Sequence, residues 1–231
     1  MKKTICLVSF LMVLFISTQS HAQITFGAKA GLNIANMSTS GTAASGETKS
    51  AIASFHVGAI ADIGITKEFF IEPGILLSGK GFKDVTTIPI MQATETVTGS
   101  IKPLYIEIPI NAMYVADLKT VKLQIFAGPY IGFGIGGNIN LDYSSSGTLP
   151  TGYTLPASSS KAIKFGSDAT TDDLKMLDFG LNFGVGVEYN NMLLRVQYGL
   201  GLTNINADTS TGSDTYKNNV IGISVGYMFG K

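Results

Sequence analysis

The sequence predicts an all-β protein, an eight-stranded antiparallel up-and-down transmembrane β-barrel of the outer-membrane type. Three observations lead to this fold class. Apolar and polar residues alternate with a period of two along most of the chain, which is the pattern of strands with one apolar face. Long and short connections alternate between those strands. Only 14% of the residues are charged, against about 25% in an average soluble domain.

The N-terminal segment predicts a cleaved signal peptide over residues 1–22. Lys2 and Lys3 form a basic region, and residues 5–16 form a short apolar stretch. Ser20 and Ala22 place small residues where a signal peptidase reads them. A membrane anchor is disfavoured because the apolar stretch is shorter than the roughly 20 residues of a spanning helix. We therefore expect an exported protein whose mature barrel domain covers residues 23–231.

Composition excludes several classes of function. Cys6 is the only cysteine and lies inside the predicted signal peptide. The mature chain therefore offers no thiol, no disulfide and no cysteine metal site. Removal of Lys2 and Lys3 leaves 14 basic against 16 acidic residues, a formal net charge of about −2. A nucleic-acid partner has no electrostatic support at that charge.

Eight segments carry the period-two alternation, and no helical periodicity competes with it. Each segment has roughly the 9–11 residues that a tilted strand needs to cross a bilayer. The apolar faces of the expected strands run through residues 24–34, 55–65, 69–77, 104–114, 121–135, 179–189, 194–202 and 221–229.

The connections predict the topology. We expect tight turns at residues 66–67, 117–120 and 190–191, where Asn190 and Asn191 tolerate the positive φ of a two-residue hairpin. Strict alternation places all long loops at one end of the barrel and both termini at the other. Short periplasmic turns and long outer loops are the arrangement of outer-membrane barrels. The expected long polar loops are residues 37–50, 81–100, 142–176 and 206–218.

The residues behind the apolar face distinguish a membrane barrel from a secreted soluble barrel of the lipocalin type. In the stretch DFGLNFGVGVEYNNMLLRVQYGLGLTNI, glycines and charges alternate with apolar residues. A glycine stripe facing water would weaken the strands and pack nothing. Inside a narrow barrel, small residues leave room for larger ones beside them. Phenylalanines and tyrosines near strand ends suit the aromatic girdles of a membrane barrel. We therefore expect the apolar face in lipid.

The inward register carries charge in a narrow space. Buried charges are tolerated only when they are paired and hydrogen-bonded. We expect a structural plug of ion pairs in which Arg195 organises the acidic lumen residues as a clasp. Glu188 is expected to approach Arg195 across the 190–191 turn. A selective pore or proton path is the disfavoured alternative, because eight strands leave little more than side-chain space. The inward charges are Lys29, Asp62, Glu72, Lys80, Glu107, Lys122, Asp178, Glu188 and Arg195.

No catalytic constellation is evident. His56 is the only histidine of the mature chain, and Ser54 or Ser78 could serve as its nucleophile. Nothing places a nucleophile, a base and an orienting acid at a recognisable spacing. We therefore interpret His56 as a hydrogen-bonded lumen residue and expect no catalytic residues.

Two further motifs are interpreted as structural, so we expect no cofactor and no metal ligand. The glycine-rich stretch at residues 132–137 superficially suggests a phosphate loop. It lies inside a predicted strand and lacks the Lys-Ser/Thr and helix that such a loop requires. Asp168, Asp172 and Asp173 superficially suggest a calcium site, but their spacing fits no EF-hand. A solvated acidic loop is the favoured interpretation.

The motifs FGAKAGLNIANMS, YIEIPINAMY, FAGPYIGFGI and FGLNFGVGVEYNNMLLRVQYGLGLTNI, with a terminal GISVGYMF, resemble the PorT-like family of outer-membrane β-barrel proteins. The resemblance covers nearly the whole mature chain. It implies an eight-stranded barrel inserted by the outer-membrane barrel assembly machinery. PorT itself is associated with secretion across the outer membrane, but most members have no assigned activity, and no catalytic residues carry over. One departure is that Gly230 and Lys231 follow Phe229, where many such barrels end on an aromatic residue.

These observations favour a non-enzymatic integral protein of the cell outer membrane, surrounded by outer-membrane lipid. Its lumen is plugged, and its long loops serve a structural or interaction role. The expected contact surface for an envelope or extracellular protein is the loop 142–176, which carries Tyr143, Tyr153, Leu155 and Phe165. Loops on a rigid scaffold commonly carry function. An accessory role in protein export, a small-solute pore and a lipid-modifying barrel enzyme remain alternatives.

Overall fold

The computed structural model describes residues 24–40, 47–210 and 213–229. The predicted signal peptide, residues 1–22, lies outside the described residues. No helix in the described part of the chain has the length and hydropathy to cross a membrane. The strands are β1 (Ile24–Thr39), β2 (Glu47–Ser50), β3 (Ile52–Gly64), β4 (Phe69–Gly79), β5 (Phe82–Ile90), β6 (Ala93–Asp117), β7 (Lys122–Gly147), β8 (Ser159–Ala162), β9 (Leu177–Tyr189), β10 (Met192–Gly201) and β11 (Tyr216–Phe229).

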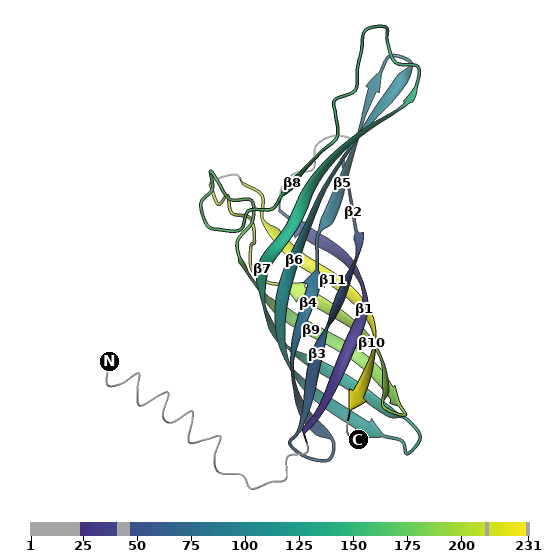
Figure 1. The fold of residues 1–231 in the computed structure, drawn as a ribbon, viewed down its shortest axis with the longest axis vertical. Helices are drawn as coiled ribbons and strands as arrows, with labels where there is room; N and C mark the ends of the chain where they lie inside the picture. Colours follow the sequence, from purple (N-terminus) through teal and green to yellow (C-terminus); the bar gives the residue numbers. More distant parts are fainter. Residues whose placement is uncertain (1–23, 41–46, 211–212, 230–231) are drawn as a thin grey trace, which may run out of the picture.

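Eight of these strands close into a ring (Figure 1). In chain order they are β1, β3, β4, β6, β7, β9, β10 and β11, and β11 pairs back with β1. Every neighbouring pair is antiparallel. A closed ring satisfies the backbone donors and acceptors of each strand without leaving an edge in lipid. The predicted eight-stranded up-and-down barrel is confirmed.

The two faces of the sheet differ as the alternation predicts. Outward apolar side chains are widely exposed, with Leu32 at 67% and Ile125 at 62%. Inward polar side chains are buried, with Lys29 at 3% and Arg195 at 1%. A lipid-facing band and a polar interior therefore follow directly from the residue order on each strand.

The three tight turns lie at one end of the barrel, together with the start of β1 and the end of β11 (Figure 1). Asn190 and Asn191 have φ values of 47° and 66°. These are the left-handed conformations that a two-residue hairpin turn requires. In the turn between β3 and β4, the Thr66 hydroxyl accepts the N–H groups of Glu68 and Phe69. We call this the turn end and the opposite one the arm end.

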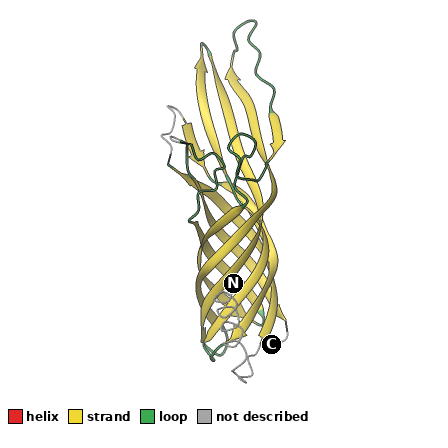
Figure 2. Ribbon diagram, turned by 90° about the vertical axis from the view of Figure 1, so that its left-hand side faces the viewer, coloured by secondary structure: helices red, strands yellow, loops and turns green. Residues whose placement is uncertain are grey.

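The prediction of irregular loops at the arm end is wrong in part. Residues 82–90 and 93–100 form the β5–β6 hairpin, and β7 runs on to Gly147 beside it. These strands project well beyond the barrel (Figures 1 and 2). The short strands β2 and β8 pair with β5 and β7. We define the outer arm as β5, residues 93–102 of β6 and residues 138–147 of β7.

The outer arm forms because its sequence favours strands although it is polar. Threonine, valine and isoleucine are enriched in strands, and they fill the stretch DVTTIPI and its partner ATETVTG. β1 likewise continues to Thr39 and β11 begins at Tyr216, inside the loops expected at 37–50 and 206–218. A polar composition therefore did not predict where the strands of this barrel end.

Candidate functional site in the barrel lumen

Glycines of the inward register make room for the large side chains of the lumen. Gly184 pairs in the ladder with Phe126, and Gly180 pairs with Tyr130. A β-carbon at Gly184 would lie 2.7 Å from Cε2 of Phe126, and one at Gly180 would lie 2.5 Å from Cε1 of Tyr130. The rings therefore lie directly over their glycine partners. This is the packing role that the glycine stripe predicted.

Lys80 is the centre of a buried charge cluster toward the arm end. Its Nζ lies 2.7 Å from Oε2 of Glu107 and 3.0 Å from Oδ2 of Asp178. The same ammonium lies 4.1 Å from the centre of the Tyr130 ring. Asp178 also accepts a hydrogen bond of 2.9 Å from Nδ2 of Asn218. The ammonium of Lys80, the residue that follows β4, thus contacts carboxylates of β6 and β9 and the face of an aromatic ring.

The candidate Ser–His pair lies in the middle of the lumen. His56 and Ser78 are ladder partners on β3 and β4, and both are buried. Nδ1 of His56 lies 2.8 Å from Oδ1 of Asn33, and Nδ2 of Asn33 lies 3.2 Å from the Ser78 hydroxyl. Asn33 therefore stands between the two, and Ser54 is not in this chain of hydrogen bonds. Nearby, Lys29 donates to Gln197 over 3.2 Å.

Arg195 organises the layer toward the turn end, but its partner is not the predicted one. Nη1 lies 2.6 Å from Oε2 of Glu72 on β4, across the lumen. Nε and Nη2 both donate to Oε1 of Gln124, over 3.0 and 2.8 Å. The predicted contact with Glu188 is wrong because the hairpin register places Leu193 opposite Glu188 and Gly186 opposite Arg195. The Arg195 side chain lies over that glycine and points across the barrel.

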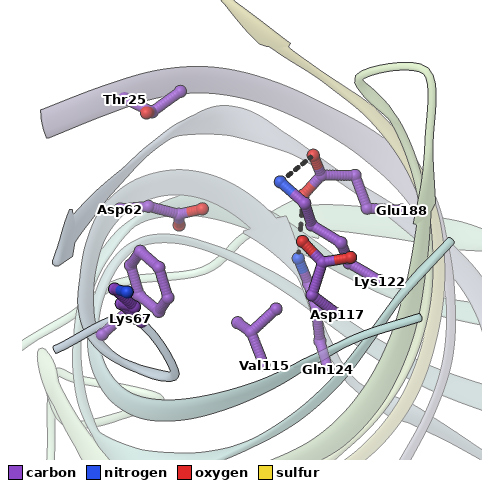
Figure 3. Close-up of a pocket in the computed structure, with 9 residues that line it drawn as sticks. Thr25, Asp62, Lys67, Val115, Asp117, Lys122, Gln124 and Glu188 are labelled. Atoms are coloured by element: carbon purple, nitrogen blue, oxygen red, sulfur yellow. Dashed lines mark hydrogen bonds and ion pairs between the residues drawn. The ribbon is translucent and has the colours of Figure 1, made fainter. Parts of the chain in front are cut away.

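Glu188 belongs instead to a vestibule at the turn end (Figure 3). It accepts a hydrogen bond of 3.2 Å from Gln124 and lies 3.9 Å from the ammonium of Lys122. The cavity measures about 210 Å³. Figure 3 shows the carboxylates of Asp62 and Asp117 directed into it from opposite sides. The vestibule is the place where the buried charge network meets solvent, since the Lys122 side chain is 37% exposed.

An apolar cap fills the lumen at the arm end. It consists of buried side chains from β1, β5 and the segments that follow β8 and β10. Phe165 packs against this cap and edge-on against the Tyr105 ring, with centroids 5.9 Å apart. Phe165 therefore points into the barrel. The sequence had placed it on the expected contact surface for a partner. The cap residues are Met37, Phe82, Ile163, Leu174 and Ile205.

The acidic residues between β8 and β9 stabilise local turns. Hydrogen bonds from the hydroxyl and N–H of Thr170 lower the pKa of Asp168. Asp173 is partly buried, which acts to raise its pKa, but hydrogen bonds from Lys161 and from the Lys164 N–H outweigh that and lower it. Asp172 accepts the N–H of Asp168. Within the described residues, no group of three metal-ligating side chains is suited to a metal ion. The glycine-rich stretch 132–137 lies within β7, as expected.

The inward register was predicted correctly for all nine charged residues. Eight are buried, and Lys122 stands at the mouth of the vestibule. The neutral members of the network were not singled out, although the same alternation places them inward. These are Asn33, Tyr105, Asn111, Gln124, Tyr130, Asn182, Gln197 and Asn218.

The family comparison agrees with this architecture. A family model described as outer membrane protein beta-barrel domain matches residues 18–207. No curated protein matches the sequence. The structure is similar to Ail, the attachment invasion locus protein of Yersinia pestis, solved with the heparin analogue sucrose octasulfate, at 11% identity over 90% of this chain and 99% of that one, TM-score 0.41. Neisserial surface protein A is 13% identical over 90% of this chain and 99% of that one, with a TM-score of 0.41. The outer membrane protein OprG of Pseudomonas aeruginosa is 13% identical over 93% of this chain and 100% of that one, with a TM-score of 0.35.

Proposed function

Because the chain belongs to the outer-membrane β-barrel family, we propose that it is a non-enzymatic, non-conducting scaffold whose outer arm contacts a protein partner outside the cell. The protein resides in the outer membrane. In this proposal the turn end faces the periplasm and the arm end faces outward, as is usual for such barrels. The observation that carries the proposal is a barrel filled by side chains that supports a long projecting sheet.

The filling of the lumen supports the non-conducting part. The Arg195 and Lys80 clusters each join opposite walls of the barrel with contacts of 2.6–3.0 Å. The apolar cap lies beyond them at the arm end. An eight-stranded barrel has an interior just wide enough for side chains to fill. A small-solute pore would require all three layers to move.

The shape of the outer arm supports the interaction part. Apolar side chains near its tip are exposed far from the lipid-facing band, with Met91 at 91% and Ile88 at 43%. Tyr153, in the connection that returns from β7, is 38% exposed and donates a hydrogen bond to Glu95 of the arm. Exposed apolar and aromatic groups on a rigid scaffold are the usual anchors of protein interfaces. The contact surface thus includes residues 82–100 in addition to the segment from 142.

The alternative of a lipid-modifying enzyme has less support. Of the two candidate pairs, His56 and Ser78 are buried in the lumen and connected through Asn33, and Ser54 is outside that chain of hydrogen bonds. A lipid substrate approaches from the outer surface of the barrel, where neither side chain is exposed. The resemblance to PorT-like proteins, by contrast, supports a component of a protein-export apparatus as the protein partner of the outer arm.

Site-specific photocrosslinking in intact cells tests this function. We would place a photoreactive amino acid at Met91 on the arm tip and, as a matched control, at Asn190 in a tight turn. The proposal predicts a discrete protein adduct from position 91, identified by mass spectrometry and absent from position 190. Absence of any adduct at position 91, or the same adduct at both positions, would contradict it.

A further inference from the structure

The lipid-facing band of the barrel ends at a defined height near the outer arm. On β6 the outward residues run Ile110, Ile108, Ile106 and Leu104, and the next one is Lys102. Two residues correspond to about 7 Å along a strand, or about 5 Å along the membrane normal at the usual tilt. The headgroup layer on each side of a bilayer is about 5–7 Å thick. The Lys102 backbone therefore lies at headgroup level when Leu104 lies at the edge of the hydrocarbon.

A pocket opens at this height on the outward face. It measures about 310 Å³ and lies where β3, β5, β6 and β7 meet. Ala51 and Ala53, which flank the first residue of β3, line its apolar side. Lys83, Ser100 and Lys102 line its polar side. Lys83 and Ser100 are ladder partners, so both lie on the face to which Lys102 belongs. The pocket thus joins small apolar groups to two ammonium groups and a hydroxyl.

The two lysines of this pocket have no hydrogen-bond or ion-pair partner among the described residues. Three other lysines at the arm end have protein partners: Lys49 donates to Thr39, Lys161 pairs with Asp173, and Lys175 donates to the Asn204 carbonyl. In the part of the chain that the structure describes, no hydrogen bond or ion pair occupies the ammonium of Lys83 or Lys102. Asp142 also lines the pocket, which leaves one net positive charge.

We propose that this pocket binds the phosphate of a membrane lipid of the outer leaflet. Lys83 and Lys102 hold the phosphate oxygens, and the lipid chains lie along the apolar face below, beside Leu104 and Leu77. Ammonium groups at the membrane surface attract anionic lipid headgroups, and lysine stems can lie along apolar surface while the charge reaches the headgroup. A soluble anion would use only the polar half of the pocket. A lipid uses both halves, which is why the lipid is the occupant that the geometry favours.

Native mass spectrometry of the protein released from phosphatidylcholine nanodiscs tests the proposal. The nanodiscs would contain either diphosphorylated lipid A or the same glycolipid without phosphate. Each lysine near a charged membrane surface contributes roughly a five-fold change in association, so two contribute about 30-fold. We therefore expect a Lys83→Gln/Lys102→Gln variant to retain the phosphorylated lipid about 30-fold more weakly than the parent protein. Lys164→Gln is the matched control at the same end of the barrel, and it should leave retention unchanged.

Three results would overturn the lipid site. The double variant could retain phosphorylated lipid as well as the parent does, or the parent could retain the phosphate-free glycolipid equally well. In a third arm, inorganic phosphate is added as a competitor. Displacement by inorganic phosphate at concentrations similar to the lipid would show a site for free anions. None of these results depends on a protein partner of the outer arm, so the lipid site and the proposed function are tested separately.

Discussion

Arg195 on β10 reaches across the lumen to Glu72 on β4, with Nη1 2.6 Å from Oε2 and 2.7 Å from Oε1. Both side chains are fully buried. Oε1 of Gln124 accepts hydrogen bonds from Nε and Nη2 of Arg195, and the Phe126 ring lies 4.9 Å from the guanidinium carbon. The pair connects strands on different sides of the ring, so it fixes the shape of the barrel as well as neutralising two charges.

Replacement of Arg195 by methionine should destabilise the barrel by about 3–5 kcal/mol, because it leaves Glu72 buried without its cation. Urea unfolding in lipid vesicles would measure this. Since the chain has no tryptophan, circular dichroism or the heat-dependent electrophoretic shift would report the folded fraction.

The double variant Arg195→Met/Glu72→Met provides the control for that prediction. Replacement of a whole buried ion pair by apolar side chains is often neutral or stabilising. The double variant should therefore be closer in stability to the parent than Arg195→Met alone. Equal losses in the single and double variants would show that Arg195 acts through packing instead of through Glu72.

Val196 tests the outer face next to the same residue. It is 45% exposed and pairs with Val185 and Ile223. Val196→Arg should cost about 2–4 kcal/mol if it lies near the middle of the bilayer. The measurement is the same unfolding experiment, with Val196→Leu as control. Normal insertion and parental stability of Val196→Arg would reverse the assignment of inside and outside.

Gly184 tests the packing of rings over glycines. Gly184→Ala places a β-carbon 2.7 Å from Cε2 of the buried Phe126 ring. Overpacking of this kind typically costs about 1–3 kcal/mol. Gly136→Ala is the matched control, because no atom lies within 4 Å of the β-carbon it adds. The midpoint of urea unfolding should fall for the first variant and stay close to that of the parent for the second.

Tyr153 reports whether the segment after β7 folds back onto the outer arm. Its hydrogen bond to Glu95 raises its pKa above the ordinary value of 10.0. The raised pKa means that this contact is fully present below pH 10 and is lost as pH rises through the folded-state pKa. Phenolate absorbance, read as the difference between the parent and Tyr153→Phe, should show late titration of Tyr153. Glu95→Gln should return the titration toward 10.0, and an unchanged curve would contradict the contact.

The sequence predicted the barrel well because its signals are local. Alternation along each strand is sufficient to assign Leu32 to the outside and Lys29 to the inside. The turn at Asn190 and Asn191 was equally accessible, since two asparagines suit positive φ. All nine inward charges were assigned in this way without knowledge of any partner.

The features that the sequence did not reveal depend on contacts between distant segments. The partner of Arg195 is set by how the barrel closes, which brings β4 opposite β10 although 123 positions separate the two residues. Phe165 and Leu174 enter the cap only because the connection folds back into the mouth. The outer arm was missed for a different reason, because its threonine-rich strands resemble a polar loop in composition.

We propose that the lumen is closed by its own side chains, and ion conductance across planar bilayers tests this closure most directly. The parent protein, reconstituted in its folded form, should give no unitary current steps at any applied voltage. The variants Arg195→Met and Lys80→Met should also give no current steps, because the apolar cap still covers the lumen in both of them. Regular steps of one fixed conductance from the parent protein would contradict the closed lumen and would favour the small-solute pore.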